Sequence, residues 1–325
     1  MSDQALTLDI VVPLYNEELS VGHFHSELVR MAASLAVNVV IYYVNDGSRD
    51  ATGAILEEIA RQDSRVVVVE LSRNFGHQAA LSAGLDISKG DVVVTMDGDG
   101  QHPPELIPEM LKLFETGYDV VLAQRGDIRE SAFLKRLTSG VFYWLLSRIS
   151  DTKMTPGCAD YRLMSRPVVD ALKGMREYHR FLRGMVAWLG YRTVILPYAE
   201  KPRLAGRSRY SLGKMVNLAT DAISSFSLVP LRVGIGLGLC FLVFAVLEMG
   251  YVLRFWLRGE QHLLVPGWSS LMLAILLVGG SVMITLGVIG TYVGYIFQEV
   301  KRRPAYVIRS VRAVAGDSRA ERAEP

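Results

Sequence analysis

The chain has 325 residues, which is enough for a complete catalytic domain and a further segment. Hydrophobic residues make up 50% of it and the mean hydropathy is +0.25, with the apolar excess in the last third. The net charge of +2 carries little information by itself, and we expect no nucleic-acid partner.

The cysteines and the N-terminus bear on the compartment. Cys158 and Cys240 lie far apart, which excludes a disulfide framework and the spacing of a zinc site. No basic segment followed by a long apolar run begins the chain, so we expect no cleaved signal peptide. The first domain should therefore stay in the reducing cytosol.

Up to residue 123 the sequence alternates between short apolar strands and single helices with apolar residues at helical spacing. Strands without polar alternation, separated by single helices, favour a parallel sheet covered on both faces. We therefore expect an α/β fold. The predicted strands are 8–14, 37–44, 66–71, 92–96 and 119–123, and the predicted helices are 21–35, 51–62, 78–89 and 105–116.

Polar side chains follow four of these strands directly. In open parallel sheets, ligands bind beyond the carboxyl ends of the strands, so the four clusters should converge on one edge. Any one of them could be a capped turn, but four in succession favour a binding crevice. The clusters are Tyr15 with Glu17, Asn45 with Asp46, Arg73 with Asn74, and Asp97 with Asp99.

The pair Asp97 and Asp99 is a candidate metal site. Two carboxylates two residues apart at the end of a strand repel each other, and a divalent cation with oxygen ligands relieves that repulsion. The alternative is an Asp-Gly turn in which the carboxylates only accept hydrogen bonds from backbone N–H groups.

Five motifs in this order resemble those of the family 2 glycosyltransferases. They are PLYNE (13–17), VNDGSRDAT (44–52), LSRNFGHQAALSAG (71–84), DGDGQHPPE (97–105) and ADYRLMSR (159–166). The closer similarity, over roughly residues 8–308, is to the polyprenyl-phosphate branch, which includes dolichol-phosphate mannose synthase and undecaprenyl-phosphate glucosyltransferases. The resemblance implies a GT-A nucleotide-sugar-binding domain with a mostly parallel sheet, and a sugar transfer with inversion.

The resemblance also assigns donor and metal residues. It implies that Asp97 and Asp99, with Gln101 beside them, hold Mg²⁺ or Mn²⁺ on the diphosphate of the donor. Relatives often have DAD followed by leucine at this place, and the glycine spacers of DGDG are expected to leave the loop more flexible. The nucleotide is placed near Pro13, Tyr15, Glu17, Asp46 and Arg73, and His77 could touch the diphosphate.

Asp160 matches the acidic position of the DFRL-like motif of the family. By resemblance it positions the acceptor or serves as a base, so the implied catalytic residues are Asp97, Asp99 and Asp160. A lipid phosphate acceptor is already mostly ionised, since its second pKa is about 6 by analogy with phosphoserine, so a strong base is not required. The alternative is a turn carboxylate paired with Arg162.

An acceptor phosphate needs cationic partners. By resemblance, basic residues after the fifth strand and in a helix expected at 133–149 bind this phosphate. The resemblance also implies that the segment 202–214 closes over the active site. The alternative is a solvated basic helix face. The implied residues are Arg125, Lys135, Arg136, Ser139, Arg203 and Arg209.

Two apolar segments, 231–257 and 271–297, each exceed the roughly 20 residues that cross a bilayer. Basic residues before the first and after the second place both termini in the cytoplasm. Basic residues beside the amphipathic segment 215–228 are typical of a membrane-surface element. The expected parts are a catalytic domain (1–200), an amphipathic interface segment (201–230), a two-helix transmembrane hairpin (231–300) and a basic tail (301–325).

The sequence thus predicts a multi-pass plasma-membrane enzyme of the cell envelope. It would transfer one hexose, from a UDP-sugar in preference to GDP-mannose, to polyprenyl phosphate at the cytoplasmic face. A flippase is a possible partner, and glycines in the second span would permit a homo-oligomer. The alternatives are a processive polysaccharide synthase, for which a QxxRW motif is missing, and a non-catalytic membrane scaffold, against which Asp97, Asp99 and Asp160 argue.

Overall fold

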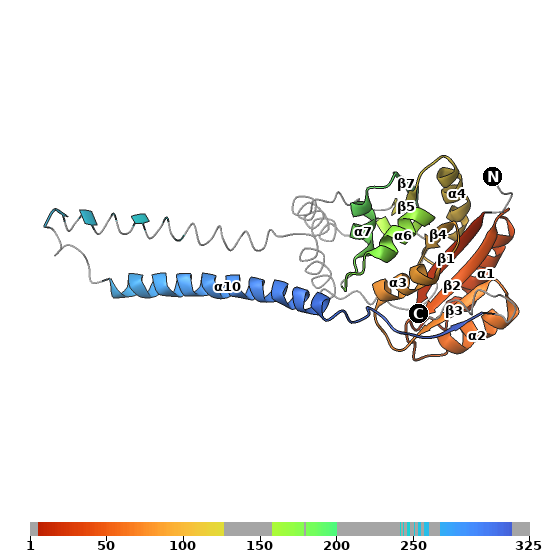
Figure 1. The fold of residues 1–325 in the computed structure, drawn as a ribbon, viewed down its shortest axis with the longest axis horizontal. Helices are drawn as coiled ribbons and strands as arrows, with labels where there is room; N and C mark the ends of the chain where they lie inside the picture. Colours follow the sequence, from red (N-terminus) through yellow and green to blue (C-terminus); the bar gives the residue numbers. More distant parts are fainter. Residues whose placement is uncertain are drawn as a thin grey trace. The chain divides into compact units, whose positions relative to one another are not determined.

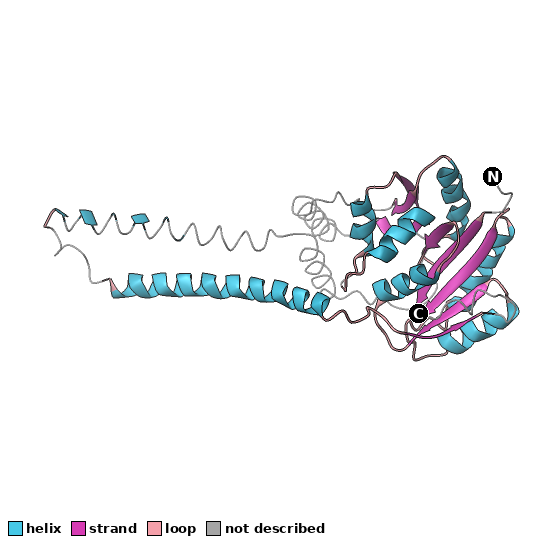
Figure 2. Ribbon diagram, viewed as in Figure 1, coloured by secondary structure: helices cyan, strands magenta, loops and turns pink. Residues whose placement is uncertain are grey.

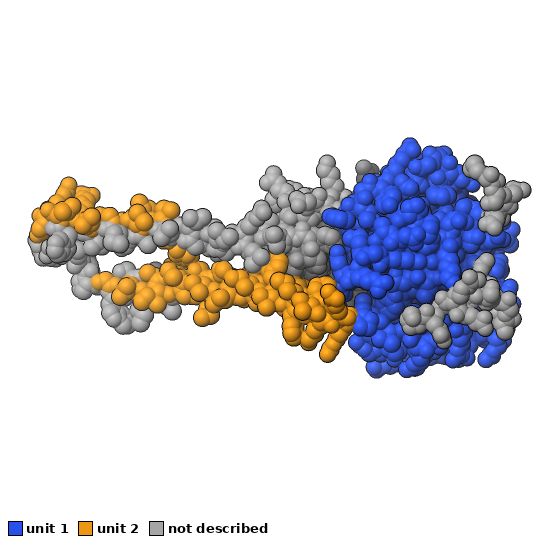
Figure 3. Space-filling view, in the orientation of Figure 1, with its two compact units in different colours: residues 1–147, 152–219, 304–325 blue, residues 148–151, 220–303 orange. Residues whose placement is uncertain are grey.

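The computed structural model describes residues 6–126, 158–178, 180–199 and 267–313, with scattered residues between 241 and 259. Two compact units can be distinguished (Figure 3). Unit 1 comprises Met1–Ser147, Thr152–Ala219 and Pro304–Pro325, and unit 2 comprises Arg148–Asp151 and Thr220–Arg303.

The described residues of unit 1 form an eight-stranded mixed sheet in the order β7-β5-β6-β4-β1-β2-β3-β8 (Figures 1 and 2). Strands β1 to β5 and β7 share one direction, and β6 and β8 run antiparallel to their neighbours. The expected α/β fold with a mostly parallel sheet is therefore confirmed. The strands are β1 (Thr7–Leu14), β2 (Asn38–Asn45), β3 (Val66–Leu71), β4 (Val92–Thr95), β5 (Val120–Arg125), β6 (Cys158–Ser165), β7 (Thr193–Tyr198) and β8 (Ile308–Arg312).

Helices cover both faces of the sheet, as expected. Apolar residues of α1, α2 and α4 join Leu8, Ile10 and Val12 of β1 in one buried core. Helix α3 packs on the opposite face, where a Cβ on Gly84 would come within 2.3 Å of Val11 Cγ1. The helices of unit 1 are α1 (Val21–Ala33), α2 (Thr52–Gln62), α3 (His77–Ile87), η1 (Pro104–Leu106), α4 (Ile107–Glu115), α6 (Arg166–Gly174) and α7 (Leu182–Leu189).

The alternation expected up to residue 123 agrees with the structure to within two residues at each element end. These strands are recognisable because they are short runs of β-branched and apolar residues that are buried on both faces.

Strand β6 is inserted in the reverse direction between β4 and β5. Thr95, the last residue of β4, pairs with Arg162, and the Thr95 hydroxyl donates to the Asp160 carbonyl oxygen at 2.7 Å. The reversal therefore brings the beginning of β6 to the edge at which β4 ends. The alternative for Asp160 was a turn carboxylate paired with Arg162. Asp160 lies in this strand and not in a turn, but it does pair with Arg162, at 2.7 Å.

Strand β8 extends the sheet at β3 and was not among the elements expected from the sequence. Glu70 of β3 pairs with Ser310, and the Ser72 N–H donates to the Val307 carbonyl at 2.9 Å. The Tyr306 hydroxyl donates to the Asp86 carboxylate of α3. The chain thus returns to the sheet of unit 1 after the apolar helix of unit 2.

Unit 2 contains the helix α10 (Trp268–Val300). Most of its described apolar side chains are exposed, and by length and composition Leu277–Val300 is the one helix among the described residues that could cross a membrane. This helix coincides with the second expected span. The first expected span, 231–257, lies largely outside the described residues.

A small polar network links α1, β2 and the end of α2. His25 Nδ1 lies 3.0 Å from the Tyr43 hydroxyl, and His25 Nε2 lies 3.8 Å from Asp63. Two hydrogen bonds from the Arg65 guanidinium, at 2.9 and 2.6 Å, hold Asp63. Burial lowers the pKa of His25, and Arg65 lowers it further, against the opposing charge of Asp63.

We predict that His25 makes the fold less stable in acid. Because its folded-state pKa lies below the ordinary value of 6.5, the unfolded chain binds more protons, and stability falls as the pH drops below about 6.5. His25→Gln keeps an acceptor for Tyr43 but does not titrate. The melting temperature of the wild type should therefore exceed that of the variant by less at pH 5 than at pH 7.5. A difference in melting temperature that stays constant or grows on acidification contradicts a lowered pKa of His25 in the folded protein.

Candidate functional site

The loops that follow the parallel strands share one edge of the sheet, and the reversed strand β6 begins there. This arrangement brings the described candidate residues to the same edge from six different strands. Pro13 is buried within β1, while Tyr15, Glu17, Asp46, Arg73, Asp97, Asp99, Gln101, Arg125 and Asp160 stand at or just beyond the strand ends. Lys135, Arg136, Ser139, Arg203 and Arg209 lie outside the described residues.

The loops after β1 and β2 are hydrogen-bonded to each other. The Asn16 N–H donates to the Ser48 hydroxyl at 3.0 Å, and the Arg49 N–H donates to the Asn16 side-chain oxygen at 2.8 Å. The Glu17 N–H donates to the Thr52 hydroxyl at 2.9 Å. Asn16 has a φ of +54°, a conformation that asparagine tolerates better than most residues. The segment that carries Tyr15 and Glu17 is therefore held in one shape.

Asp46 is buried and fixes the loop after β3. Its two carboxylate oxygens accept the Phe75 N–H at 2.7 Å and the Gly76 N–H at 2.9 Å. Burial raises the pKa of Asp46, against these two N–H donors. The resemblance of the sequence motifs places this carboxylate near the nucleotide, where it could accept a hydrogen bond from a base N–H. Each oxygen has a second lone pair, so that role remains compatible with the contacts present.

Arg73 is exposed next to the same loop. Its guanidinium carbon lies 4.1 Å from the centre of the Phe75 ring, and its Nη1 donates to the Asn74 carbonyl at 3.1 Å. These local contacts hold the side chain on the loop that Asp46 fixes.

The Asp97–Asp99 loop is shaped by its glycines. A Cβ on Gly98 would lie 2.3 Å from Leu14 Cδ2, and Gly100 has a φ of +80°. The glycines, which we expected to make the loop flexible, thus each meet a steric requirement. Asp99 is 9% exposed and accepts the Gln101 N–H at 3.1 Å, which is the contact expected of a turn carboxylate.

Asp97 differs from Asp99 in its surroundings. Within the described part of the chain, its buried Oδ1 makes no hydrogen bond, although His77 Nε2 lies 3.4 Å away. Its other oxygen lies 3.7 Å from His102 Nε2. The turn alternative therefore accounts for Asp99 but leaves a buried carboxylate oxygen of Asp97 unexplained.

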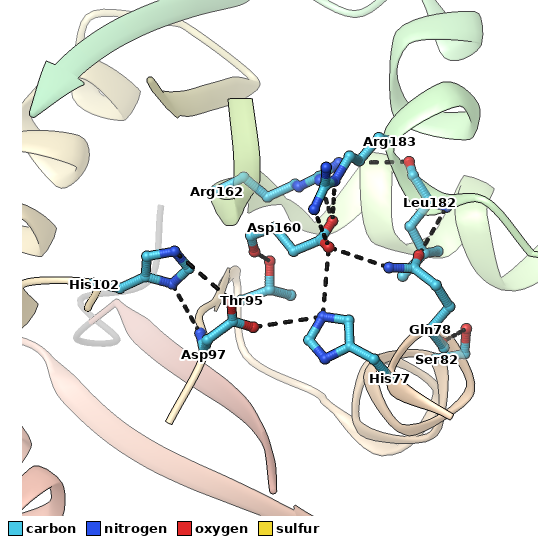
Figure 4. Close-up of polar contacts among 10 residues, drawn as sticks. All are labelled: His77, Gln78, Ser82, Thr95, Asp97, His102, Asp160, Arg162, Leu182 and Arg183. Carbon is cyan, nitrogen blue, oxygen red and sulfur yellow. Dashed lines mark hydrogen bonds and ion pairs between the residues drawn. The ribbon is translucent and has the colours of Figure 1, made fainter. Parts of the chain in front are cut away.

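Asp160 is buried at this edge and contacts Arg162, Arg183, Gln78 and His77 (Figure 4). Its Oδ1 accepts from Arg162 at 2.7 Å and from Arg183 Nε at 3.0 Å. Its Oδ2 accepts from Arg183 Nη2 at 2.8 Å and from the Gln78 amide at 3.1 Å. Burial opposes the ionisation of Asp160, but Arg183, His77 and Arg162 outweigh it and hold its pKa well below the usual range.

His77 connects the two carboxylate groups, because its Nε2 lies 3.4 Å from both Asp97 Oδ1 and Asp160 Oδ2. Burial lowers the pKa of His77, but the hydrogen bond with Asp160 and the charge of Asp97 together raise it to about 9. The candidate metal pair and Asp160 therefore belong to one charged cluster, contributed by the loop after β4, by α3 and by β6.

Arg183 and Gln78 were not among the site residues expected from the sequence. Gln78 donates to Asp160 and its side-chain oxygen accepts the Leu182 N–H at 3.1 Å, so it joins α3 to α7. Arg183 is 23 residues away from Asp160 in the chain and lies in none of the motifs used above. Gln78 does lie in the motif 71–84, directly after His77, so that motif was the available signal for it.

No three His, Cys, Asp or Glu side chains form a metal-binding group among the residues that the structure describes. The edge offers instead a pair of carboxylates with Gln101 beside them. This is the donor set of a cation that completes its coordination with water and with substrate phosphates, as Mg²⁺ does when it binds through one or two carboxylates.

The sheet and its row of polar strand ends define a GT-A-like α/β domain of a sugar-transferring enzyme. The chain belongs to glycosyl transferase family 2, whose model matches residues 9–173. The resemblance found in the sequence motifs is thereby confirmed.

Curated relatives match over nearly their whole length. An uncharacterized glycosyltransferase of Synechocystis sp. is 39% identical over 307 residues, covering 93% of this chain and 95% of the relative. A prophage bactoprenol glucosyl transferase homolog of Escherichia coli is 37% identical over 310 residues, covering 94% of this chain and 100% of the relative. A prophage-derived bactoprenol glucosyl transferase of Shigella flexneri is 38% identical over 307 residues, covering 94% and 98%.

We predict that Gly47→Ala destabilises unit 1. Gly47 has a φ of +65°, and a Cβ there would lie 2.5 Å from the Arg73 carbonyl carbon. The left-handed conformation alone costs about 1–2 kcal/mol, and moving the backbone after β3 adds to it. The melting temperature should fall by several degrees, whereas Gly174→Ala, where a Cβ meets nothing within 4 Å, should leave it nearly unchanged. Equal melting temperatures for the two variants contradict the packing described.

We predict that Asp160→Asn lowers the stability of unit 1. Removing one partner of a buried ion pair costs about 3–5 kcal/mol, and Arg162 is only 4% exposed. Asp170→Asn is the control, because Asp170 is 58% exposed and pairs with Arg166 at the surface. Thermal unfolding of both variants checks the prediction. A normal melting temperature for Asp160→Asn would show that the arginines do not need this carboxylate.

Proposed function

We propose that this chain transfers a single hexose from a UDP-sugar, with UDP-glucose the first candidate, to polyprenyl phosphate. The observation that supports this most is the similarity to bactoprenol glucosyl transferases along more than nine-tenths of both chains. The coverage includes the region beyond the family 2 domain, so the similarity extends to the apolar part of the chain that we propose lies at the membrane.

In the proposed reaction, a phosphate oxygen of the lipid forms a bond to the anomeric carbon, the bond to the nucleoside diphosphate breaks, and the configuration inverts. The acceptor phosphate is already ionised near neutral pH, so no side chain has to remove a proton. Asp160 suits this chemistry as a positioning group: its low pKa and its arginine partners make it a weak base, and it orients Arg183 and His77.

The carboxylate edge fits a divalent cation. The buried Asp97 Oδ1, which makes no hydrogen bond within the described residues, is the observation that supports this fit. Asp97 and Asp99 would hold Mg²⁺ or Mn²⁺, with Gln101 beside them, and the cation would neutralise the charge of the departing diphosphate. Asp46 and the loop it fixes would support the nucleotide near Tyr15 and Arg73.

The acceptor would be bound at a membrane. Helix α10 has the length and composition of a span, and we propose a second span at 231–257 with both termini in the cytoplasm. The basic interface segment 201–230 would lie at the cytoplasmic surface, where Arg125, Lys135, Arg136, Ser139, Arg203 and Arg209 would bind the lipid phosphate. Transfer of the product across the bilayer by a flippase, and homo-oligomer formation, remain parts of this proposal.

The proposal predicts one lipid product. Full-length protein in detergent is incubated with undecaprenyl phosphate, Mn²⁺ or Mg²⁺, and a panel of nucleotide sugars, and lipids are read by mass spectrometry. One donor should give lipid phosphate plus one hexose, and EDTA should abolish the product. Asp99→Asn should lower the rate at least about 100-fold, in line with the loss of an electrostatic catalytic contact, while Asp170→Asn should be as active as the wild type. A product carrying many sugars, or full activity in EDTA, would contradict the proposal.

A further inference from the structure

His102 has an environment that the proposed reaction does not by itself require. The imidazole is fully buried, although it lies only three residues from Asp99. Its ring stacks on Tyr161 of β6 with centroids 5.0 Å apart and planes 19° apart, and it meets the edge of Tyr198 of β7 at 6.1 Å. The ring thus packs against two strands of the sheet that lie outside the loop that carries it.

Both nitrogens of this ring face Asp97 (Figure 4). Nδ1 accepts the Asp97 backbone N–H at 2.9 Å, so in the neutral ring the proton lies on Nε2. Nε2 lies 3.7 Å from Asp97 Oδ2, which is beyond hydrogen-bond length, and it makes no hydrogen bond within the described residues. One buried ring therefore contacts the main chain and faces the side chain of the same aspartate.

The support for this ring continues into the strand that carries Asp160. The Tyr161 hydroxyl donates to the Pro103 carbonyl at 2.7 Å, directly after His102 in the chain. Tyr161 follows Asp160, so β6 presents the carboxylate to the edge and the aromatic ring to His102. The position of the Asp97 loop is in this way coupled to the position of β6.

We propose that His102 is a positioning residue that sets the place and direction of the Asp97 carboxylate for binding a divalent cation. The inference rests on the proposed metal-dependent function. It assigns His102 no contact with substrate. A residue that orients a metal-binding side chain typically contributes 10–100-fold to metal affinity, and a buried ring stacked on tyrosine holds its hydrogen bond with the Asp97 N–H in one direction.

Two variants separate the hydrogen bond from the packing. His102→Phe keeps an aromatic ring for Tyr161 and removes the acceptor for the Asp97 N–H. His102→Asn removes the ring but places its side-chain oxygen where Nδ1 stood, so the acceptor is retained. The exposed His23, which contacts only Glu27 at 3.7 Å among the ion pairs of the described chain, gives the control His23→Asn.

The test measures Mn²⁺ affinity in the presence of UDP, by the electron paramagnetic resonance signal of free Mn²⁺, on full-length protein in detergent. His102→Phe should bind Mn²⁺ about 10–100-fold more weakly than the wild type, and His102→Asn should recover most of that loss. The melting temperatures should have the opposite order to the Mn²⁺ affinities. The phenylalanine variant should be more stable than the asparagine variant, because only the phenylalanine variant keeps a buried ring. His23→Asn should match the wild type in both measurements.

Two results would overturn the inference. The first is Mn²⁺ affinity equal to that of the wild type in both His102 variants. The second is affinity that follows the melting temperature, with the asparagine variant the weaker binder, since that ranking means that packing alone matters. If the wild type itself binds no Mn²⁺ with UDP, the proposed metal-dependent function fails, which is a different outcome from equal binding by all variants.

Discussion

The structure depends on one buried negative charge at the carboxyl edge of the sheet. Asp160 is 3% exposed, and a carboxylate so deeply buried is tolerated only with cationic partners and hydrogen bonds. Arg162 comes from the same strand, Arg183 from α7, and His77 and Gln78 from α3. Satisfying this one charge therefore fixes the mutual positions of a strand and two helices around the site.

The same charge explains why Asp160 is better suited to orientation than to proton removal. Its oxygens face two guanidinium groups, and the low pKa that follows makes the carboxylate a weak base. An acceptor that is already an anion needs no base, but it does need cations that are held still. The buried Asp160 carboxylate holds the cationic side chains of Arg183 and His77 in place at this edge, and the backbone hydrogen bonds of Asp46 hold the loop that follows β3.

Much of this architecture could be predicted from local patterns, but the contacts across the sheet could not. The strands β1 to β5 are runs of apolar residues with polar residues directly after them, so their shared edge followed from parallel topology. Strand β6 was not predicted because its reversed direction depends on pairing with β4. Strand β8 was not predicted because it pairs with a strand more than 200 residues earlier in the chain. Gln78 and Arg183 were missed for the same reason: only the folded chain brings them to Asp160. Asp46 was expected to contact the nucleotide, and no sequence pattern indicated that it also binds two backbone N–H groups of another loop.

We propose that the edge formed by Asp97 and Asp99 binds a nucleoside diphosphate through a divalent cation. Isothermal titration of UDP into the full-length wild type, once with Mn²⁺ and once with EDTA, tests it most directly. If the two carboxylates hold the cation, UDP should bind measurably with Mn²⁺ and should lose most of that affinity in EDTA. Equal UDP affinity under both conditions would show that the diphosphate is held by protein groups alone, and it would contradict the role given to the two carboxylates.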